Sequence, residues 1–142
     1  MATQKPTTLG YAEIATLVSA VTTAMAAGAS GAESVQGLTG ACTAAEGSTF
    51  ANPGGATKIA ANGFDVQNAT VTTSDSGAGV NDTVEVDHIF TCDTAPQSVT
   101  GFTVMNDDDD VVFMEACFAA AVPCEIDDTI TIEAKMQFKL GA

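Results

Sequence analysis

The stretch from Thr129 to Leu140 constrains the fold most, because its side chains alternate strictly between polar and apolar. The apolar positions are Ile130, Ile132, Ala134, Met136, Phe138 and Leu140. A period of two places each set on its own face of an extended strand, whereas a helix would mix the two sets around its surface. The segment therefore predicts a half-buried β-strand with one fully apolar face.

Further strands follow from residue 64 onward. In residues 83–92 the positions that share the apolar face are Val84, Val86, His88, Phe90 and Cys92, with Ile89 as the exception on the polar face. Residues 64–73, 99–106 and 111–122 also predict strands, separated by turn signals at residues 76–77, residues 106–110 and Pro123. We expect a mainly β fold: an antiparallel β-sandwich, jelly-roll-like, with one N-terminal helix.

The N-terminal part has helical periodicity. Its apolar positions are Ile14, Leu17, Val18, Val21 and Met25, between Thr8 as a candidate N-cap and Gly28 as a stop. The composition then shifts to small residues, with a turn signal at residues 52–55. The sequence predicts one compact domain overall: a helical segment at 1–28, a Gly/Ala-rich loop at 29–58 with at most one short strand, and the β-sandwich at 59–142.

The charge balance excludes one class of partner. The 142 residues hold 18 Asp and Glu against four Lys and no Arg, which gives a net charge of -14. Without a basic face the chain cannot neutralise a phosphate backbone, so we expect no nucleic acid partner. Repulsion among these charges is screened beyond ~10 Å at 0.1 M salt and ~3 Å at 1 M, and the composition resembles that of proteins from extreme halophiles. The alternative is an ordinary acidic protein kept soluble by its charge.

No membrane partner is expected either. The first residues, MATQKPTTLG, lack the basic start and apolar core of a signal peptide, and no apolar run reaches the ~18 residues that a membrane span needs. We therefore expect synthesis inside the cell, where the protein stays until it joins a larger assembly.

Catalytic residues are hard to place in this sequence. His88 is the single histidine and lies on the apolar face of a predicted strand, which favours a core or interface role over a catalytic base. The four cysteines form no CxxC pair and lack basic neighbours, so neither a zinc site nor a reactive thiol is indicated. Cys117 and Cys124 bracket Pro123, and a turn there could bring them together in a disulfide; buried thiols are the alternative. We expect no enzymatic activity.

The densest set of candidate ligands is the acidic run Asp107, Asp108, Asp109 and Asp110. Carboxylate oxygens suit Ca²⁺ or Mg²⁺, and a monovalent cation is a further candidate. The run lacks the glycine and terminal glutamate of an EF-hand loop, so the competing interpretation is a solvated turn between two strands. Asp127 and Asp128 precede the last strand and have the same simple explanation. We expect no other cofactor.

Residues 99–140, VTGFTVMNDDDDVVFMEACFAAAVPCEIDDTITIEAKMQFKL, carry a resemblance. They run through a Gly-Phe-x-Val-x-Asn strand, an acidic turn, a strand into Cys-Phe-Ala, an Asp-Asp-Thr turn and a long alternating strand. This order resembles small virion proteins of tailed viruses, in which a short strand, a hairpin and an alternating last strand close a β-sandwich. Together with the halophile-like composition, the resemblance implies a tailed virus of haloarchaea.

We accordingly expect a virion structural protein, a capsid-exterior turret or decoration protein. It would form a homo-oligomer (a trimer or pentamer), dock on the major capsid protein or other virion proteins, and be assembled in the host cytoplasm. A tail or baseplate component is the alternative within this class. From other classes we keep a cation-stabilised ligand-binding module of a haloarchaeal cell, and behind it a metal-dependent hydrolase.

Overall fold

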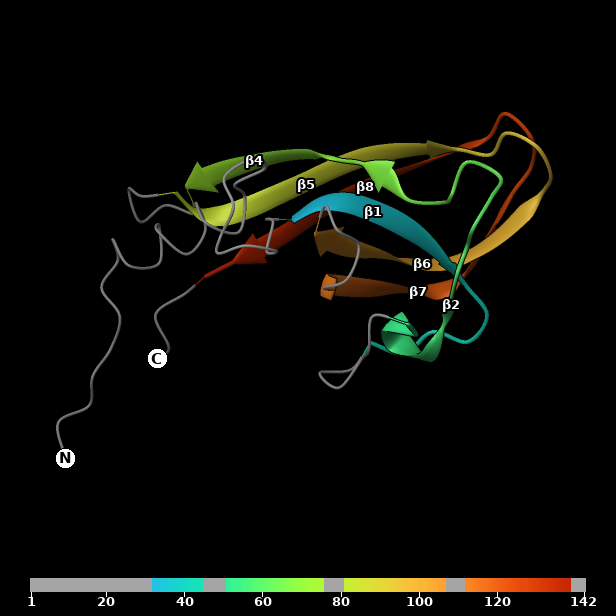
Figure 1. Ribbon diagram of the computed structural model, residues 1–142, viewed down its shortest axis with the longest axis horizontal. Coiled ribbons are helices and arrows are strands. Elements are labelled where there is room, and N and C mark those ends of the chain that lie inside the picture. Colours follow the sequence, from blue (N-terminus) through green and yellow to red (C-terminus); the bar gives the residue numbers. More distant parts are fainter. Residues whose placement is uncertain (1–31, 45–50, 76–80, 107–111, 139–142) are drawn as a thin grey trace, which may run out of the picture.

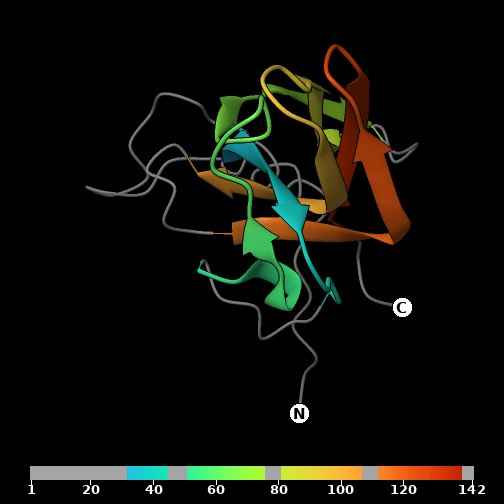
Figure 2. The ribbon, with the colours of Figure 1, turned by 90° about the vertical axis from the view of Figure 1, so that its right-hand side faces the viewer.

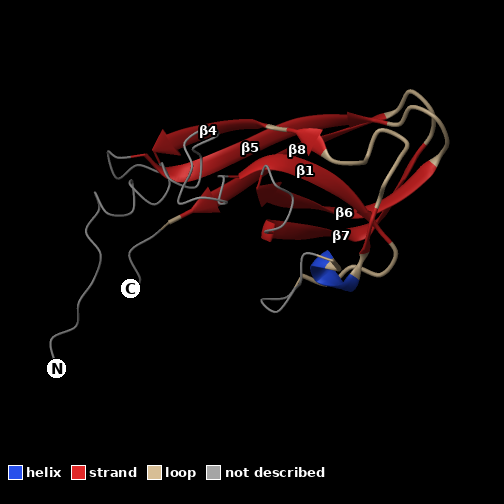
Figure 3. Ribbon diagram, viewed as in Figure 1, coloured by secondary structure: helices blue, strands red, loops and turns tan. Residues whose placement is uncertain are grey.

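Two antiparallel β-sheets make up the part of the chain that the computed structural model describes, residues 32–44, 51–75, 81–106 and 112–138 (Figures 1 and 3). The elements are β1 (Ala32–Thr39), the 3₁₀ turn η1 (Pro53–Gly55), β2 (Thr57–Lys58), β3 (Gln67–Asn68), β4 (Thr70–Asp75), β5 (Asn81–Thr91), β6 (Gln97–Asn106), β7 (Val112–Cys124) and β8 (Thr129–Gln137). The predicted mainly β, antiparallel fold is therefore confirmed. The predicted N-terminal helix lies outside the described residues, and no helix within them is long and apolar enough to cross a membrane.

The two sheets are linked by a nested pattern of strand pairing. One sheet has the order β2-β1-β6-β7, with β3 also paired to β1, and the other has the order β4-β5-β8. β6 pairs with β7, and β5 pairs with β8 on either side of them in the sequence. The β5–β6 and β7–β8 segments therefore form one antiparallel ribbon whose two ends lie in different sheets, as the loops at the right of Figure 1 show.

A single core lies between the sheets. Its fully buried members come from both sheets and from the loop before β3, and include Val35, Phe64, Val84, Val86, Phe90, Val99, Val104, Ile132 and Ala134. The rings of Phe64 and Phe90 lie 5.3 Å apart, which ties that loop to the middle of β5. The one-sided alternation of β5 and β8 follows from this arrangement, because each strand has only one face toward the core.

The strand β1 differs from the prediction for residues 29–58, which allowed one short strand in a long loop. It is eight residues long and lies between β6 on one side and β2 and β3 on the other. Val35 faces the core, while Ser34, Gln36 and Leu38 are buried on the opposite face. A strand buried on both faces need not alternate between polar and apolar, so the periodicity that revealed β5 and β8 is missing here.

Residues 42–44 and 51–58 cover part of the sheet face that points away from the core (Figure 2). A disulfide joins Cys42, just after β1, to Cys117 in β7. Gly54 of η1 packs on it so closely that a Cβ atom there would lie 3.0 Å from the Cys117 sulfur and 3.1 Å from the Cys42 sulfur. The suggested Cys117–Cys124 disulfide is therefore wrong. Cys117 is bonded to Cys42, whereas Cys124 is a buried free thiol beyond a bulge in β7, where Gly101 pairs with Cys117 but Val99 pairs with Val122.

Candidate functional site

The candidate site forms where β5 extends beyond the end of its neighbour β4. The last β4 pair on this side is Thr70 with Asp87, so β5 continues beyond β4 from His88 onward. The residues before β4 belong to the other sheet, and the chain passes between the two sheets at Ala69. The Ala69 N–H donates to the Glu33 carbonyl at 2.8 Å. The loop of residues 61–66 fills the place that a longer β4 would take.

Gly63 brings this loop against the edge of β5. It has a φ of +78°, and a Cβ atom built on it would overlap the Thr91 carbonyl oxygen. Only glycine combines a left-handed backbone with so close an approach. The next residue, Phe64, is then buried, and its carbonyl accepts a hydrogen bond from the Gly37 N–H at 2.9 Å. The loop is thus held between the two sheets.

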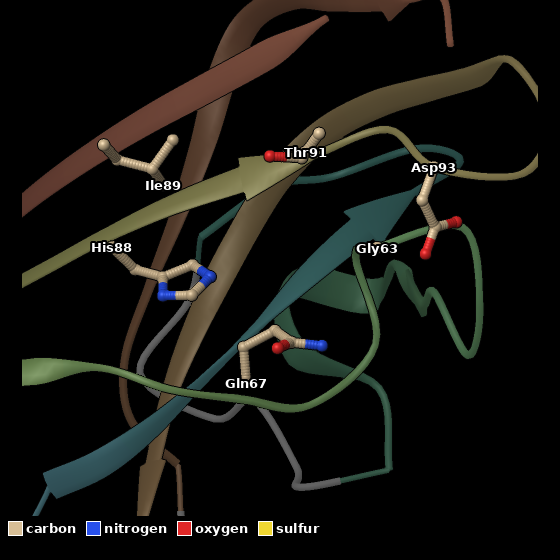
Figure 4. A pocket seen from close by; sticks show the side chains of 6 residues that line it. All are labelled: Gly63, Gln67, His88, Ile89, Thr91 and Asp93. Carbon is tan, nitrogen blue, oxygen red and sulfur yellow. The ribbon is translucent and has the colours of Figure 1, made fainter. Parts of the chain in front are cut away.

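An open cavity of about 240 Å³ lies between this loop and β5 (Figure 4). It is lined by Gly63, Gln67, His88, Ile89, Thr91 and Asp93. An amide, an imidazole, a hydroxyl and a carboxylate thus surround it, while the Ile89 side chain is 60% exposed beside it. Such a lining offers hydrogen-bond donors and acceptors to a small polar ligand.

His88 is the titratable group nearest the core in this cavity. Its ring packs edge-on against Phe90 with the centroids 4.6 Å apart, and the side chain is half-buried. Burial lowers the pKa of His88, and a backbone hydrogen bond with Asn68 acts in the opposite direction. The imidazole is therefore mainly neutral at pH 7 and can accept a proton or a hydrogen bond.

The geometry around His88 does not assemble a nucleophile and its base. Among the described residues no hydrogen bond joins its ring to Thr91 or Asp93. The Asp93 carboxylate accepts instead from the Thr94 hydroxyl at 2.6 Å. In the same part of the chain no three His, Cys, Asp or Glu side chains are placed to hold a metal ion together.

The acidic segments singled out in the sequence fall in two places. Asp107, Asp108, Asp109 and Asp110 lie outside the described residues, between β6 and β7, so a cation site there stays a prediction. Asp127 and Asp128 form the turn before β8. Asp127 has a φ of +72°, and the Asp128 carboxylate accepts a hydrogen bond from the Glu125 N–H at 2.9 Å, which is the expected chemistry of a turn.

A second open cavity, of about 230 Å³, lies on the outer face of the β4-β5-β8 sheet. The Lys135 ammonium and the Ser74 hydroxyl both donate to the Glu85 carboxylate, at 2.9 and 2.7 Å. The hydrogen bond from Lys135, followed by that from Ser74, lowers the pKa of Glu85. Because these groups already satisfy one another, this cavity is the weaker candidate for binding.

Sequence reasoning missed the cavity at His88 as a site. Its lining comes from two segments, residues 63–67 and 88–93. They come together only because the chain passes from one sheet to the other at Ala69. The Asn62-Gly63 pair was the available signal, because such a pair marks a tight turn.

No known protein family, curated protein or solved structure matches this chain. The chemistry of the site therefore has to be inferred from its own residues.

Proposed function

We propose that this chain is a structural protein of a virus particle that self-associates and docks on other particle proteins. A capsid-exterior turret or decoration protein of a halophilic tailed virus is the specific role. A tail or baseplate component is the alternative within the class. Such a role requires surfaces for contact with other chains and no reacting groups.

The observation that carries the proposal is the uncharged second half of β7. This strand forms an edge of its sheet, since among the described strands only β6 pairs with it. All five residues from Ala119 to Pro123 are exposed, and no charged residue occurs from Ala116 to Pro123 in a chain of net charge -14. Charges, prolines and bulges all protect exposed strand edges from pairing with another chain. Pro123 and the bulge between Cys117 and Val122 limit backbone pairing here, but no charge opposes apolar contact. This exposed segment therefore favours side-chain packing against a second copy or a neighbouring protein.

The strand β8, one of the two edge strands of the other sheet, provides a contrast. The outer face of β8 carries Glu133 and Lys135, both exposed, and Lys135 pairs with Glu85 on β5. These charges protect that edge in the usual way. The difference between β7 and β8 therefore favours β7 over β8 as the side used for assembly.

The nested strand pairing supports the finer part of the proposal. The segments that resemble tailed-virus virion proteins fall on β6, β7 and β8 with the turns between them. Pairing of β5 with β8 around β6 with β7 is the pattern of a folded ribbon, which jelly rolls also use. We therefore propose a jelly-roll-like sandwich that the N-terminal helix completes.

Sedimentation velocity in molar KCl tests self-association at β7. We expect the wild-type chain to form a discrete oligomer and Ala120→Lys to sediment as a monomer, because a lysine on the edge leaves a charge in the contact. Ala60→Lys, the same change at an exposed residue away from β7, should leave the oligomer intact. A monomeric wild-type chain, or equal behaviour of both variants, would refute assembly through this edge.

Association with particles is a separate experiment. Virus particles banded from the host that carries the gene would be digested and analysed by mass spectrometry. Peptides of this chain at a constant ratio to the major capsid protein support the proposal. Their absence from the particles would exclude it.

The cavity at His88 favours a second candidate, the cation-stabilised ligand-binding module of a haloarchaeal cell. Because His88 is the single histidine, its ring gives one imidazole signal in NMR spectra. A saturable shift of that signal with a small polar ligand, abolished in Gln67→Ala, would support this function. A signal that stays constant across such ligands would remove it.

A further inference from the structure

The two cysteines outside the disulfide meet at the end of the molecule where the ribbon passes between the sheets. Cys92 directly follows β5 and Cys124 is the last residue of β7. Their exposed fractions are 0% and 2%, and both are free thiols in this structure. They therefore mark the two crossings, one from β5 to β6 and one from β7 to β8.

The backbone holds these crossings together. The Cys92 N–H donates to the Asp128 carbonyl at 2.9 Å, and the Cys92 carbonyl accepts from the Asp127 N–H at 2.7 Å. On the other side, Cys124 pairs with Gln97 in the register of β6 and β7. The positions of both cysteines are thus fixed by regular strand pairing on either side of them.

The Cys92 thiol lies against the backbone of Cys124. The Cys92 thiol lies 3.4 Å from the Cys124 carbonyl and 3.1 Å from the Ala95 carbonyl, to which it can donate. Burial raises the pKa of the Cys124 thiol most, and the neighbouring Cys92 raises it further. The two buried cysteines are therefore neighbours on adjacent stretches of backbone, where we expect side-chain rotation to bring the two sulfurs together.

We propose that Cys92 and Cys124 form a second disulfide bond in this protein by exchange with a low-molecular-weight disulfide. One cysteine thiolate attacks the small disulfide, forms a mixed disulfide and releases a small thiolate. The other cysteine thiolate then attacks the protein sulfur of the mixed disulfide and releases the second small thiolate. The two protons of the protein thiols end on the two small thiols, which carry the two electrons away.

This bond would connect the two sheets covalently. It would join the end of β5, which belongs to one sheet, to the end of β7, which belongs to the other, across a sequence separation of 32 residues. The existing Cys42–Cys117 bond links only parts of one sheet and its covering segment. The second bond is independent of the proposed function and would hold whatever the assembly is.

Counting thiols in the full-length protein tests the proposal. The protein is equilibrated in molar KCl with mixtures of reduced and oxidised glutathione, quenched with acid, unfolded, alkylated and weighed. We expect two alkylated cysteines in the most reducing mixture that keeps Cys42–Cys117 intact, and none in the most oxidising one. A digest of the oxidised form should yield a peptide pair linked through Cys92 and Cys124. Because both thiols are buried, the reaction should be slow and should accelerate in mild denaturant.

Two controls identify the bond. In Cys92→Ser the remaining Cys124 should stay alkylatable or carry one glutathione, with no linked peptide. The oxidised wild-type protein should melt about 10 °C above its form with Cys92 and Cys124 reduced, since a loop of this length restricts the unfolded chain. Two alkylatable thiols in every mixture, or glutathione on both cysteines without a linked pair, would overturn the proposal even if the variant fails to fold.

Discussion

Replacing Gly63 by alanine tests how the loop of residues 61–66 is held against β5. A Cβ atom there would overlap the Thr91 carbonyl oxygen, so the loop must move away from the strand. Gly55 offers a matched control, because its φ of +72° is close to the +78° of Gly63 but a Cβ atom on it meets nothing within 4 Å. Comparison of Gly63→Ala with Gly55→Ala thus separates the close approach from the backbone conformation.

The expected magnitudes follow from these contacts. The left-handed backbone costs an alanine about 1–2 kcal/mol in either variant. Moving the Gly63 loop also weakens two backbone hydrogen bonds, from Gly37 to Phe64 at 2.9 Å and from Asp93 to Asn62 at 3.4 Å, worth about 1 kcal/mol each. It also partly exposes Phe64, whose complete truncation would cost about 3–5 kcal/mol. We expect Gly63→Ala to lose about 2–3 kcal/mol more folding free energy than Gly55→Ala.

Thermal unfolding followed by far-UV circular dichroism in molar KCl measures this difference. At about 4 °C per kcal/mol for a domain of this size, Gly63→Ala should melt about 10 °C below Gly55→Ala. Equal melting temperatures would refute the reasoning, because the loop would then not be held in contact with Thr91.

Three further predictions concern charge, pH and the disulfide. The melting temperature should rise steadily from dilute buffer to molar KCl, because a net charge of -14 must be screened, and a flat profile would contradict the halophile interpretation. Because burial lowers the pKa of His88, its contribution to stability is complete above the unfolded value of about 6.5 and is lost as the pH falls through the folded value. His88→Gln should therefore show a shallower fall in melting temperature than the wild type between about pH 6.5 and pH 5, and parallel profiles would count against this. Replacing Cys42 and Cys117 together by serine should destabilise the fold by about 4 kcal/mol, because the disulfide closes a loop of 75 residues, and an unchanged midpoint in urea would disprove it.

The sequence predicted the strands that bury one face, and it missed the strand that is buried on both faces. β5 and β8 were recognised because polar and apolar residues alternate along them. β1 gave no such signal, since Gln36 is buried on the face opposite Val35 and its amide donates to the Ile59 carbonyl at 2.7 Å. A buried polar residue whose amide N–H is hydrogen-bonded to a distant carbonyl looks like an exposed one in the sequence.

Proline was misread for a related reason. Pro123 was expected to end a strand and start a turn, yet it lies within β7 opposite Ser98. An edge strand tolerates proline where the missing N–H would point to solvent, and sequence alone does not reveal which strands are edges. The lining of the cavity at His88 could not be predicted either. It depends on the chain passing between the sheets at Ala69, and no residue pattern in the sequence marks that point.

The nested ribbon has a consequence for the order in which the chain can fold. The β6–β7 hairpin involves neighbours in the sequence, whereas β5 must wait for β8, and closing the longer loop costs more entropy. On the ribosome, β5 therefore emerges well before its partner, and Val84, Val86 and Phe90 stay uncovered on one side until β8 follows. During that interval the nascent chain exposes an apolar strand beside an unpaired edge, the state in which misassembly begins. A translation pause before residue 129 should therefore lower the yield of soluble protein, and an unchanged yield would contradict this folding order.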